Sequence, residues 1–308
     1  MKKIALIGTG AIGGVLAQHL ASLRNIEIFL YDVAPGRAYG KVLDIGHAFS
    51  ARKSTYMAPV YSSEDITQIK GADFIIITAG FMRSAHMTRQ DLLYKNIDVF
   101  KQIAPIIQVY APNSMVLVVT NPVDTMTWFF QHITGYPKKQ VFGMAGSLDE
   151  ARFRYYVAKH LGVQFAAVET KVIGVHNDKM LPLPNYTTVN GAPLSDYMNP
   201  LDVANMIKET KQAGTKITEL YQTQSPYFGA AAAIFQIFSN FLQNEKTLVT
   251  LSAPYKDEDI YIGQSCWVDA TGICQIDELQ LTKTEQKIFD QSITELSALN
   301  KEVLSNRQ

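Results

Sequence analysis

The chain has 308 residues, of which 47% are hydrophobic and 18% charged, and its 28 basic residues balance its 28 acidic ones. A zero net charge excludes a global field that would attract nucleic acid or an anionic membrane, so any anionic ligand must be held by local charges. The length allows two domains, or one large α/β unit with a sizeable core, and no apolar run is long enough to span a bilayer.

The first half of the chain alternates short apolar runs with helical patterns. The runs predict strands over residues 3–7, 26–31, 74–78 and 115–120, and the helical patterns cover residues 12–23 and 91–110. The third and fourth runs are continuously apolar, which is typical of strands buried on both faces of a parallel sheet. We therefore predict an α/β fold that begins with a Rossmann-type doubly wound parallel sheet over residues 1–145.

The second half has a different pattern. It predicts a helix over 146–161, a strand over 169–175, a mostly helical stretch over 201–241, a hairpin over 259–268 and 272–276, and a last helix over 282–303. No low-complexity linker separates the halves. We predict a smaller α+β substrate and catalytic domain over residues 146–308, packed closely on the first.

The N-terminus and the cysteines bear on the compartment. A strand pattern that starts at Ile4 leaves no room for a signal or transit peptide. Cys266 and Cys274 match neither the spacing of a redox pair nor that of a zinc site. We therefore expect two reduced thiols in a cytoplasmic protein, and no metal site.

A glycine-rich loop joins the first predicted strand to the first predicted helix, and it consists of Gly8, Thr9, Gly10, Ala11, Ile12 and Gly13. Its first glycine permits a tight turn, its second lets the backbone approach a pyrophosphate, and its third lets the helix pack near the strand. The N–H groups and positive dipole of the helix then face the phosphates. The sequence therefore predicts a dinucleotide site here.

Asp32 ends the second predicted strand, 24 residues after Gly8. A carboxylate at this place accepts both ribose hydroxyls of NAD and repels a 2′-phosphate, which favours NAD over NADP. The alternative is a plain turn residue within the sequence Asp32-Val-Ala-Pro-Gly36.

Polar side chains follow two of the predicted buried strands. Arg83 and Arg89 flank a polar loop after the strand over 74–78, and Asn121 ends the strand over 115–120. Ligands of open parallel sheets bind beyond the carboxyl ends of the strands, which is where these three side chains lie. A solvated loop arginine is the alternative for either cation.

Three more polar residues lie in the second half. Asp149 and Arg152 are three residues apart and share a helix face, and His176 follows the strand over 169–175. Taken singly, they could be a surface ion pair and a structural histidine. Their joint occurrence with the glycine loop favours a catalytic site.

The whole pattern resembles the lactate/malate dehydrogenase family along nearly the entire chain, and most of all its lactate-dehydrogenase-like malate dehydrogenases. The matching strings are Gly8–Gly13, Thr78–Gly80, Arg83, Arg89–Leu93, Asn121–Asp124, Gly143–Gly146, Leu148-Asp149, Ala151–Arg154, His176 and Met180–Leu183. The resemblance implies NAD as cofactor, a small dicarboxylate substrate (malate or oxaloacetate) and a homodimer or homotetramer.

The resemblance also implies roles for the charged residues. His176 would accept the hydroxyl proton while hydride leaves for the nicotinamide, and Asp149 would hold the other imidazole nitrogen. Arg152 would clamp the C1 carboxylate of the substrate in two parallel hydrogen bonds. Arg89 would polarise the reacting carbonyl group.

The same resemblance implies further contacts. Asn121 would touch both the substrate oxygen and the nicotinamide side, while Asn96, Val119 and Thr120 would lie along the cofactor. Ser225 matches a small pocket residue of the family.

Arg83 discriminates between substrates in this family, because malate enzymes carry arginine there and lactate enzymes an uncharged residue. A second buried carboxylate needs a second cation to offset its desolvation. The sequence departs from the family in the loop Ser84-Ala85-His86, and again at Asn177-Asp178-Lys179 after the histidine. At the second place we expect the turn to survive, because asparagine tolerates left-handed backbone better than most residues.

Two other functions fit the same residues. One is an NAD-dependent dehydrogenase of another 2-hydroxy acid, of the L-lactate type, with Arg83 pointing into solvent. The other is a non-catalytic NAD-binding protein, although such a protein has no need of a base beside three cations.

Overall fold

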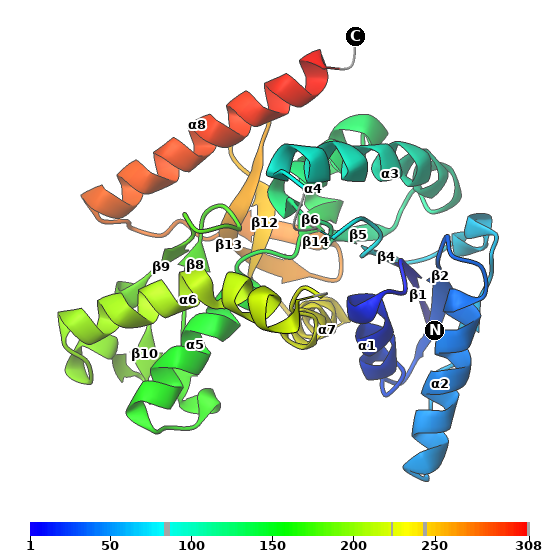
Figure 1. Cartoon of the computed structure of the whole chain (residues 1–308), viewed down its shortest axis with the longest axis horizontal. Coiled ribbons are helices and arrows are strands. Elements are labelled where there is room, and N and C mark those ends of the chain that lie inside the picture. The colour runs from blue at the N-terminus through cyan, green and yellow to red at the C-terminus, as the bar shows by residue number, and fades with distance from the viewer. Residues whose placement is uncertain (83–86, 223, 243–244, 307–308) are drawn as a thin grey trace.

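The computed structural model describes residues 1–82, 87–222, 224–242 and 245–306 (Figure 1). Its strands are β1 (Lys2–Ile7), β2 (Ile26–Tyr31), β3 (Val60–Ser62), β4 (Phe74–Ile77), β5 (Met115–Val118), β6 (Val141–Gly143), β7 (Val168–Glu169), β8 (Val172–Ile173), β9 (Leu181–Pro182), β10 (Thr188–Val189), β11 (Ala192–Pro193), β12 (Thr247–Pro254), β13 (Tyr261–Asp269) and β14 (Gly272–Ile276). Its α-helices are α1 (Ala11–Leu20), α2 (Arg37–Ala51), α3 (Arg89–Tyr110), α4 (Val123–Thr134), α5 (Ser147–Leu161), α6 (Pro200–Tyr221), α7 (Phe228–Leu242) and α8 (Lys283–Ser305). Short 3-10 helices are η1 (Ile66–Ile69), η2 (Lys138–Gln140), η3 (Phe165–Ala167), η4 (Pro184–Tyr186) and η5 (Leu194–Asp196).

The first half forms a parallel sheet with the order β6-β5-β4-β1-β2-β3. Successive side chains of β1 point to opposite faces, and both faces are buried. Ile4 and Leu6 pack with α1, α2 and α7, whereas Ala5 and Ile7 pack with α3 and α4. The predicted doubly wound Rossmann-type sheet is confirmed, and its chain order places the carboxyl ends of β1, β4 and β5 side by side.

The second half extends that sheet, which the sequence patterns did not predict. β12 runs antiparallel to β6 through the pair Ser252–Gly143, and β13 and β14 follow it as an antiparallel meander. β12 is buried because alternate residues such as Val249 and Leu251 face the core beneath α7. Residues of the second half therefore reach the edge of the sheet formed by the first.

The predicted strand over 169–175 is two short strands instead. β7 pairs with β10, while β8 pairs with β9 in a different sheet, so the chain changes partners between Glu169 and Val172. The predicted helical stretch over 201–241 is likewise two helices, because α6 ends at Tyr221 and α7 begins at Phe228. The predicted hairpin and last helix are confirmed as β13–β14 and α8.

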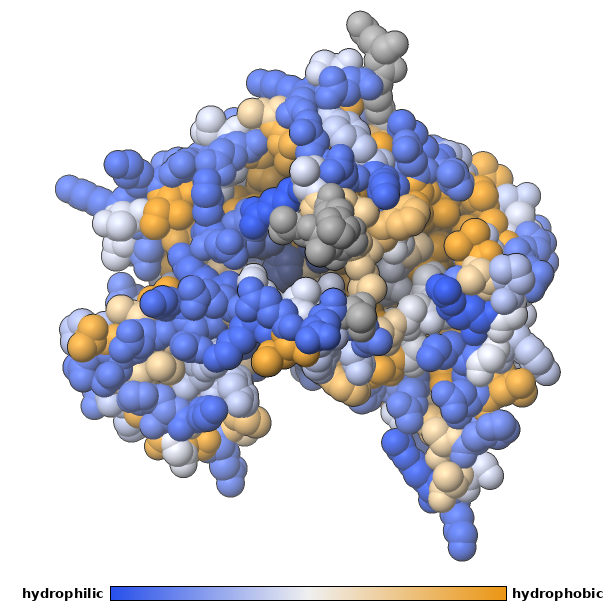
Figure 2. Space-filling model, in the orientation of Figure 1, coloured by the Kyte–Doolittle hydropathy of each residue, from blue (hydrophilic) through white to orange (hydrophobic). Residues whose placement is uncertain are grey.

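The surface seen in Figure 2 is mostly hydrophilic, with apolar residues in separate patches. A wide notch separates the lobe that carries α5 and β10 from α2, which projects from the body of the molecule (Figures 1 and 2). In the part of the chain that the structure describes, no helix combines the length and apolar character needed to cross a membrane.

Candidate active site

The glycine loop has two glycines that the protein itself requires. Gly8 has φ +98°, and a Cβ atom there would lie 2.5 Å from the backbone nitrogen of Ala79. A Cβ atom on Gly13 would collide with the carbonyl oxygen of Gly8. These two glycines allow the strand β1, the start of α1 and the end of β4 to approach closely.

Gly10 differs, because a Cβ atom there would meet nothing within 4 Å. It is the N-cap of α1, no side chain caps the helix at this position, and Ala11 begins the helix. The N–H groups of the first turn therefore face open space beside a residue without a side chain. This arrangement fits a pyrophosphate, since an anion binds at an uncapped helix N-terminus and close approach needs glycine.

Asp32 lies buried at the end of β2 and is tied to the loop. Its Oδ2 accepts hydrogen bonds from the backbone nitrogen of Thr9 at 2.8 Å and from its Oγ1 at 2.9 Å. Its Oδ1 accepts from Ala34 N at 2.9 Å and lies 3.4 Å from Nη1 of Arg37. Burial raises the pKa of Asp32, but these hydrogen bonds outweigh it and hold the pKa below its ordinary value, so the carboxylate is charged.

Asn96 lies beneath the strand ends rather than at the surface. It is fully buried, its Oδ1 accepts from Phe81 N at 2.7 Å and its Nδ2 donates to Asn121 O at 2.7 Å. Thr120 is also buried and donates from Oγ1 to Ala79 O at 2.6 Å. These bonds join the ends of β4 and β5, and they leave Asn121 exposed at the rim.

Two of the remaining predicted cofactor residues are nearby. Val119 is buried in the core that contains α1 and α7, and Ile12 packs against the same core. The side chain of Val119 is buried, whereas that of Ile12 is partly buried beside the loop.

His176 is held in place through its strand. Gly174, just after β8, exchanges two backbone hydrogen bonds with Gly263 of β13, of 2.9 and 3.1 Å. A Cβ atom on Gly263 would lie 2.5 Å from the Gly174 oxygen, so this close pairing depends on glycine. It fixes the segment that leads to His176.

Asp149, Arg152 and His176 form one buried cluster. His176 Nδ1 lies 2.6 Å from Asp149 Oδ2, and Arg152 Nη1 donates to Asp149 Oδ1 at 2.9 Å. Asp149 has 1% of its side chain exposed and belongs to the first turn of α5, where the helix dipole favours an anion. Arg152 Nη2 faces Gly214 of α6, where a Cβ atom would lie 3.2 Å away.

The cluster shifts the pKa values of both partners. Burial lowers the pKa of His176, but the Asp149 charge and hydrogen bond outweigh it, and the pKa of the imidazole rises above its ordinary value. Burial raises the pKa of Asp149, but His176 and Arg152 outweigh it and the pKa of the carboxyl falls. Asp149 is therefore charged near neutral pH, and His176 can both hold and release a proton.

The sequence analysis assigned no role to Asp124, although it lies in the same cluster. Its Oδ2 accepts from His176 N at 2.9 Å, and its Oδ1 accepts from Ser252 Oγ at 2.6 Å. The available signal was a carboxylate at the start of an apolar helix, in Val123-Asp-Thr-Met-Thr-Trp-Phe-Phe130.

A second buried acidic group beside the cluster was also missed. Glu150 Oε1 accepts from Thr250 Oγ1 at 2.5 Å and lies 3.4 Å from Lys171 Nζ. The three side chains join the start of α5 to β12 and to the residue before β8. They brace the helix that carries Asp149.

Arg89 approaches the cluster from the first half of the chain. It begins α3 after the cap Thr88, and its Nη2 lies 3.6 Å from Asp178 Oδ2, with both side chains 69% exposed. Asp178 is two residues from His176, so the start of α3 borders the loop that follows His176. Arg83 and the sequence Ser84-Ala85-His86 lie outside the described residues.

The turn after His176 survives, as expected, but a side chain holds it and Asn177 does not use left-handed backbone. Asn177 is not among the described residues with positive φ. Its Oδ1 accepts from Lys179 N at 2.7 Å, and its backbone oxygen accepts from Met180 N at 2.9 Å. Lys179 also pairs with Glu295 of α8 at 2.5 and 2.6 Å, which fixes the loop from outside.

Ser225 lies half-buried in the connection between α6 and α7. The contacts described for it do not link it to His176, and its place in a substrate pocket stays a prediction. The structure thus brings together Asp149, Arg152 and His176, and it brings Arg89 to the same loop.

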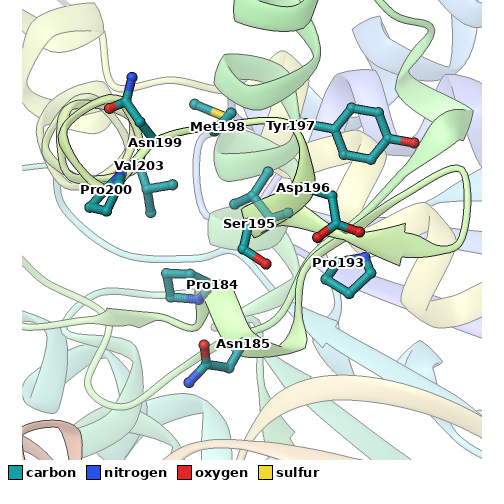
Figure 3. A pocket seen from close by; sticks show the side chains of 11 residues that line it. Pro184, Asn185, Pro193, Ser195, Asp196, Tyr197, Met198, Asn199, Pro200 and Val203 are labelled. Carbon is teal, nitrogen blue, oxygen red and sulfur yellow. The ribbon is translucent and has the colours of Figure 1, made fainter.

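A surface hollow of about 810 Å³ lies elsewhere, between η4, η5 and the start of α6 (Figure 3). Prolines, Asn185, Asn199 and Asp196 are among the residues that line it, and the lining contains no lysine, arginine or histidine. It offers no cation for a carboxylate and no imidazole base, so the chemistry is expected at His176.

Comparison with known proteins covers nearly the whole chain. Residues 2–143 match the model of the lactate/malate dehydrogenase NAD-binding domain, and residues 146–306 match that of the lactate/malate dehydrogenase alpha/beta C-terminal domain.

Solved structures of known proteins have closely similar folds. Malate dehydrogenase from Cryptosporidium parvum is 30% identical with a TM-score of 0.94, and that from Plasmodium falciparum is 32% identical with a TM-score of 0.93. Both alignments cover 99% of each chain. Lactate dehydrogenase from Cryptosporidium parvum, complexed with lactic acid and nicotinamide adenine dinucleotide, is 34% identical with a TM-score of 0.92, over 100% of this chain and 99% of that one.

Proposed function

The chain belongs to the lactate/malate dehydrogenase family and is an NAD-dependent oxidoreductase, and on that premise we propose that it interconverts (S)-malate and oxaloacetate. Both malate and lactate dehydrogenases are among the similar structures, at 30–34% identity. The choice of substrate therefore rests on residues of this chain.

The residues that would hold NAD are the loop over 8–13, the end of β2 and the ends of β4 and β5. The uncapped start of α1 would receive the pyrophosphate next to Gly10, and Asp32 would receive the adenine ribose. The long contact of Arg37 is the one that ribose hydroxyls would replace most easily, since its side chain is 54% exposed. NAD, when bound, supplies the acceptor for hydride.

His176 would handle the proton. Asp149 occupies Nδ1, so Nε2 is the nitrogen left to accept the hydroxyl proton during oxidation and to return it during reduction. The charge of Asp149 stabilises the imidazolium that forms, which is the physical reason for the raised pKa of His176. The same pair serves lactate or malate, and by itself it does not discriminate between them.

Arg152 and Arg89 would hold the substrate. Arg152 is largely buried and already fixed by Asp149, so its planar guanidinium presents further N–H donors in a set orientation to a carboxylate. Arg89 lies more openly beside Asp178 and would bring positive charge to the reacting carbonyl oxygen.

The observation that carries the proposal is Arg83, six residues before Arg89. It matches the place at which malate enzymes of this family carry arginine. A second carboxylate on the substrate would be stabilised by this cation, whereas the methyl group of pyruvate would leave it unpaired. An Arg83 that points into solvent would instead favour the L-lactate type of enzyme.

Steady-state oxidation of NADH with oxaloacetate and with pyruvate tests the proposal. We expect a wild-type preference for oxaloacetate in kcat/KM, which Arg83→Gln lowers by about 10²-fold or more, because a buried charge pair contributes several kcal/mol. His86→Ala, in the same loop, serves as the matched control and should leave the ratio unchanged. A wild-type preference for pyruvate, or an unchanged ratio in Arg83→Gln, contradicts the proposal.

We also propose a homodimer or homotetramer. Tyr39 and Leu43 on the projecting helix α2, and Leu220, Tyr221 and Phe228 around the α6–α7 connection, are large apolar side chains exposed in the single chain (Figure 1). Apolar surface of this kind is typical of contacts between subunits. Light scattering during size-exclusion chromatography measures the mass, and a monomer of 34.3 kDa would contradict this assignment.

A further inference from the structure

Asp124 is an ionisable residue in a buried and largely apolar part of its helix. It is the second residue of α4 and is 3% exposed, and residues 123–130 of the helix are all buried. Burial of an ionisable group without partners costs several kcal/mol, so a carboxylate at this place requires partners that offset its loss of hydration.

The partners of Asp124 both come from the other half of the chain. His176 N donates to Oδ2 at 2.9 Å, 52 residues away, and Ser252 Oγ of β12 donates to Oδ1 at 2.6 Å, 128 residues away. β12 adjoins β6 through Ser252 and Gly143, so the carboxylate lies where the second half joins the sheet. Each oxygen therefore has a donor with good geometry.

His176 is thus held by two buried carboxylates at different points. Asp149 holds the ring at Nδ1, and Asp124 holds the backbone nitrogen of the same residue. The two acids are in the first turns of α5 and α4, where helix dipoles favour negative charge. A shift of the His176 backbone would lengthen the 2.6 Å ring contact, because the side chain moves with the main chain.

We propose that Asp124 is a positioning residue for the acid–base reaction. It holds the His176 backbone so that the imidazole stays within hydrogen-bond distance of Asp149. The inference rests on the proposed function only in using His176 as the proton carrier. It holds for either 2-oxo acid, so a preference for pyruvate would overturn the malate assignment and leave this inference standing.

Among the residues that the structure describes, the charged groups that act on the His176 imidazole are Asp124 from α4, and Asp149 and Arg152 from α5. Asp149 and Asp124 raise the pKa of the imidazole, whereas burial and Arg152 lower it. Burial raises the pKa of Asp124 above its ordinary value, although the bonds from Ser252 and His176 reduce that rise. Removal of the Asp124 charge is therefore expected to lower the pKa of His176.

Three variants separate positioning from charge and from bulk stability. Asp124→Ala removes the acceptor for His176 N. Asp124→Asn keeps an amide oxygen for His176 N and an amide N–H for Ser252 Oγ, but removes the charge. Thr127→Val, one turn further along α4, removes a buried hydroxyl that donates to Val123 O of the same helix, and it is the matched control.

The first measurement is the single-turnover rate of NADH oxidation, with whichever of oxaloacetate and pyruvate the wild type reduces faster. We expect Asp124→Ala to lose about 10²-fold, the size of effect seen when a catalytic group is misplaced by about 1 Å. Asp124→Asn should remain within about threefold of wild type, because both hydrogen bonds are kept. Thr127→Val should match the wild type.

The second measurement needs no cofactor. NMR titration of the imidazole of His176, assigned by comparison with His176→Asn, gives its pKa in the apo protein. We expect a lower pKa in Asp124→Ala, where the imidazole loses its close contact with Asp149. The decrease should be smaller in Asp124→Asn, where only the negative charge at position 124 is lost. A purely structural role for Asp124 would leave this pKa unchanged in any variant that folds.

Two results would overturn the proposal. One is a folded Asp124→Ala enzyme whose turnover rate and His176 pKa equal those of the wild type. The other applies even if that variant fails to fold: Ser252→Ala removes the bond that orients Asp124, and we expect it to lose about five- to tenfold in rate. A Ser252→Ala enzyme with a wild-type rate and a wild-type His176 pKa contradicts the role assigned to Asp124.

Discussion

The glycine loop and the His176 cluster are built in opposite ways. The loop and Asp32 lie within the first 32 residues, and backbone atoms do most of the work, through close approaches at Gly8 and Gly13 and an uncapped helix start. The cluster draws side chains from α4, α5, the end of β8 and β12, up to 128 residues apart. A site made of backbone shape depends on local sequence, whereas a site made of buried charges depends on the whole fold.

The two regions also differ in their sensitivity to protons. In the loop, the partial charges of N–H groups do not titrate, and the pKa of Asp32 is held low. The cluster balances Asp124, Asp149, Arg152 and His176 against each other in a buried space. Binding of the cofactor and transfer of the proton should therefore respond separately to mutation and to pH.

The variant with the largest expected effect on one region alone is His176→Asn. We expect a loss of about 10²–10⁴-fold in kcat for either direction, the usual contribution of a positioned acid–base group. The dissociation constant of NADH, measured by fluorescence titration, should be unchanged because His176 takes no part in the loop. A comparable loss of NADH affinity would mean that the two regions are not separate.

The reverse experiment compares two glycines of the loop. Gly13→Ala places a Cβ atom against the Gly8 oxygen, so thermal unfolding should show lower stability, by about 1–3 kcal/mol. Gly10→Ala meets no protein atom within 4 Å, so its stability should be unchanged while NADH binds about tenfold more weakly, because one hydrogen bond or close contact to the phosphate is lost. If Gly10→Ala binds NADH as well as the wild type, the position assigned to the pyrophosphate is wrong.

The smallest and most general test is the pH profile. Reduction of the 2-oxo acid needs protonated His176, so kcat/KM should fall about tenfold per pH unit above the raised pKa of that imidazole, and oxidation of the hydroxy acid should rise through the same range. In Asp149→Asn the midpoint should move to lower pH, since the charge that raises the pKa is gone. The affinity for NADH should stay constant over this range. A decrease in that affinity over the same pH range would contradict the separation of the cofactor loop from the His176 cluster.

Local patterns predicted the first region well, because its strand, glycines and helix start follow one another in the sequence, although the close approach of Gly8 to Ala79 comes from the fold. The strand over 26–31 is β2, and the glycines, the helix start and Asp32 lie in the predicted order. The helix predicted over 91–110 begins two residues earlier, since Thr88 and Asp91 form a capping box around the start of α3. Asp149, Arg152 and His176 were recognisable from their resemblance to a family, and their contact distances came from the fold.

For the remaining features, a single sequence does not give the contacts, even where it shows an unusual residue such as Asp124. The turn at Asn177 is closed by its own side chain, which accepts from Lys179 N. Asparagine is compatible with left-handed and with right-handed backbone, so its presence did not decide between them. The partners of Asp124 are 52 and 128 residues away, and the residues around Asp124 in the sequence do not predict them. Buried polar groups are fixed by whichever donor the packing brings within 3 Å, which is a property of three-dimensional contact.

The sequence by itself determined the doubly wound start of the fold, the glycine loop with Asp32, and the set of residues suited to hydride and proton transfer. The first two follow from periodicity and from the steric freedom of glycine, which are local, whereas the set of site residues follows from the resemblance to a family. Only the tertiary structure decided that β12 joins the first sheet and that Ser252 and Asp124 meet there beneath His176. Those decisions depend on burial, because an acid that has left water must find its donors wherever the packed chain provides them.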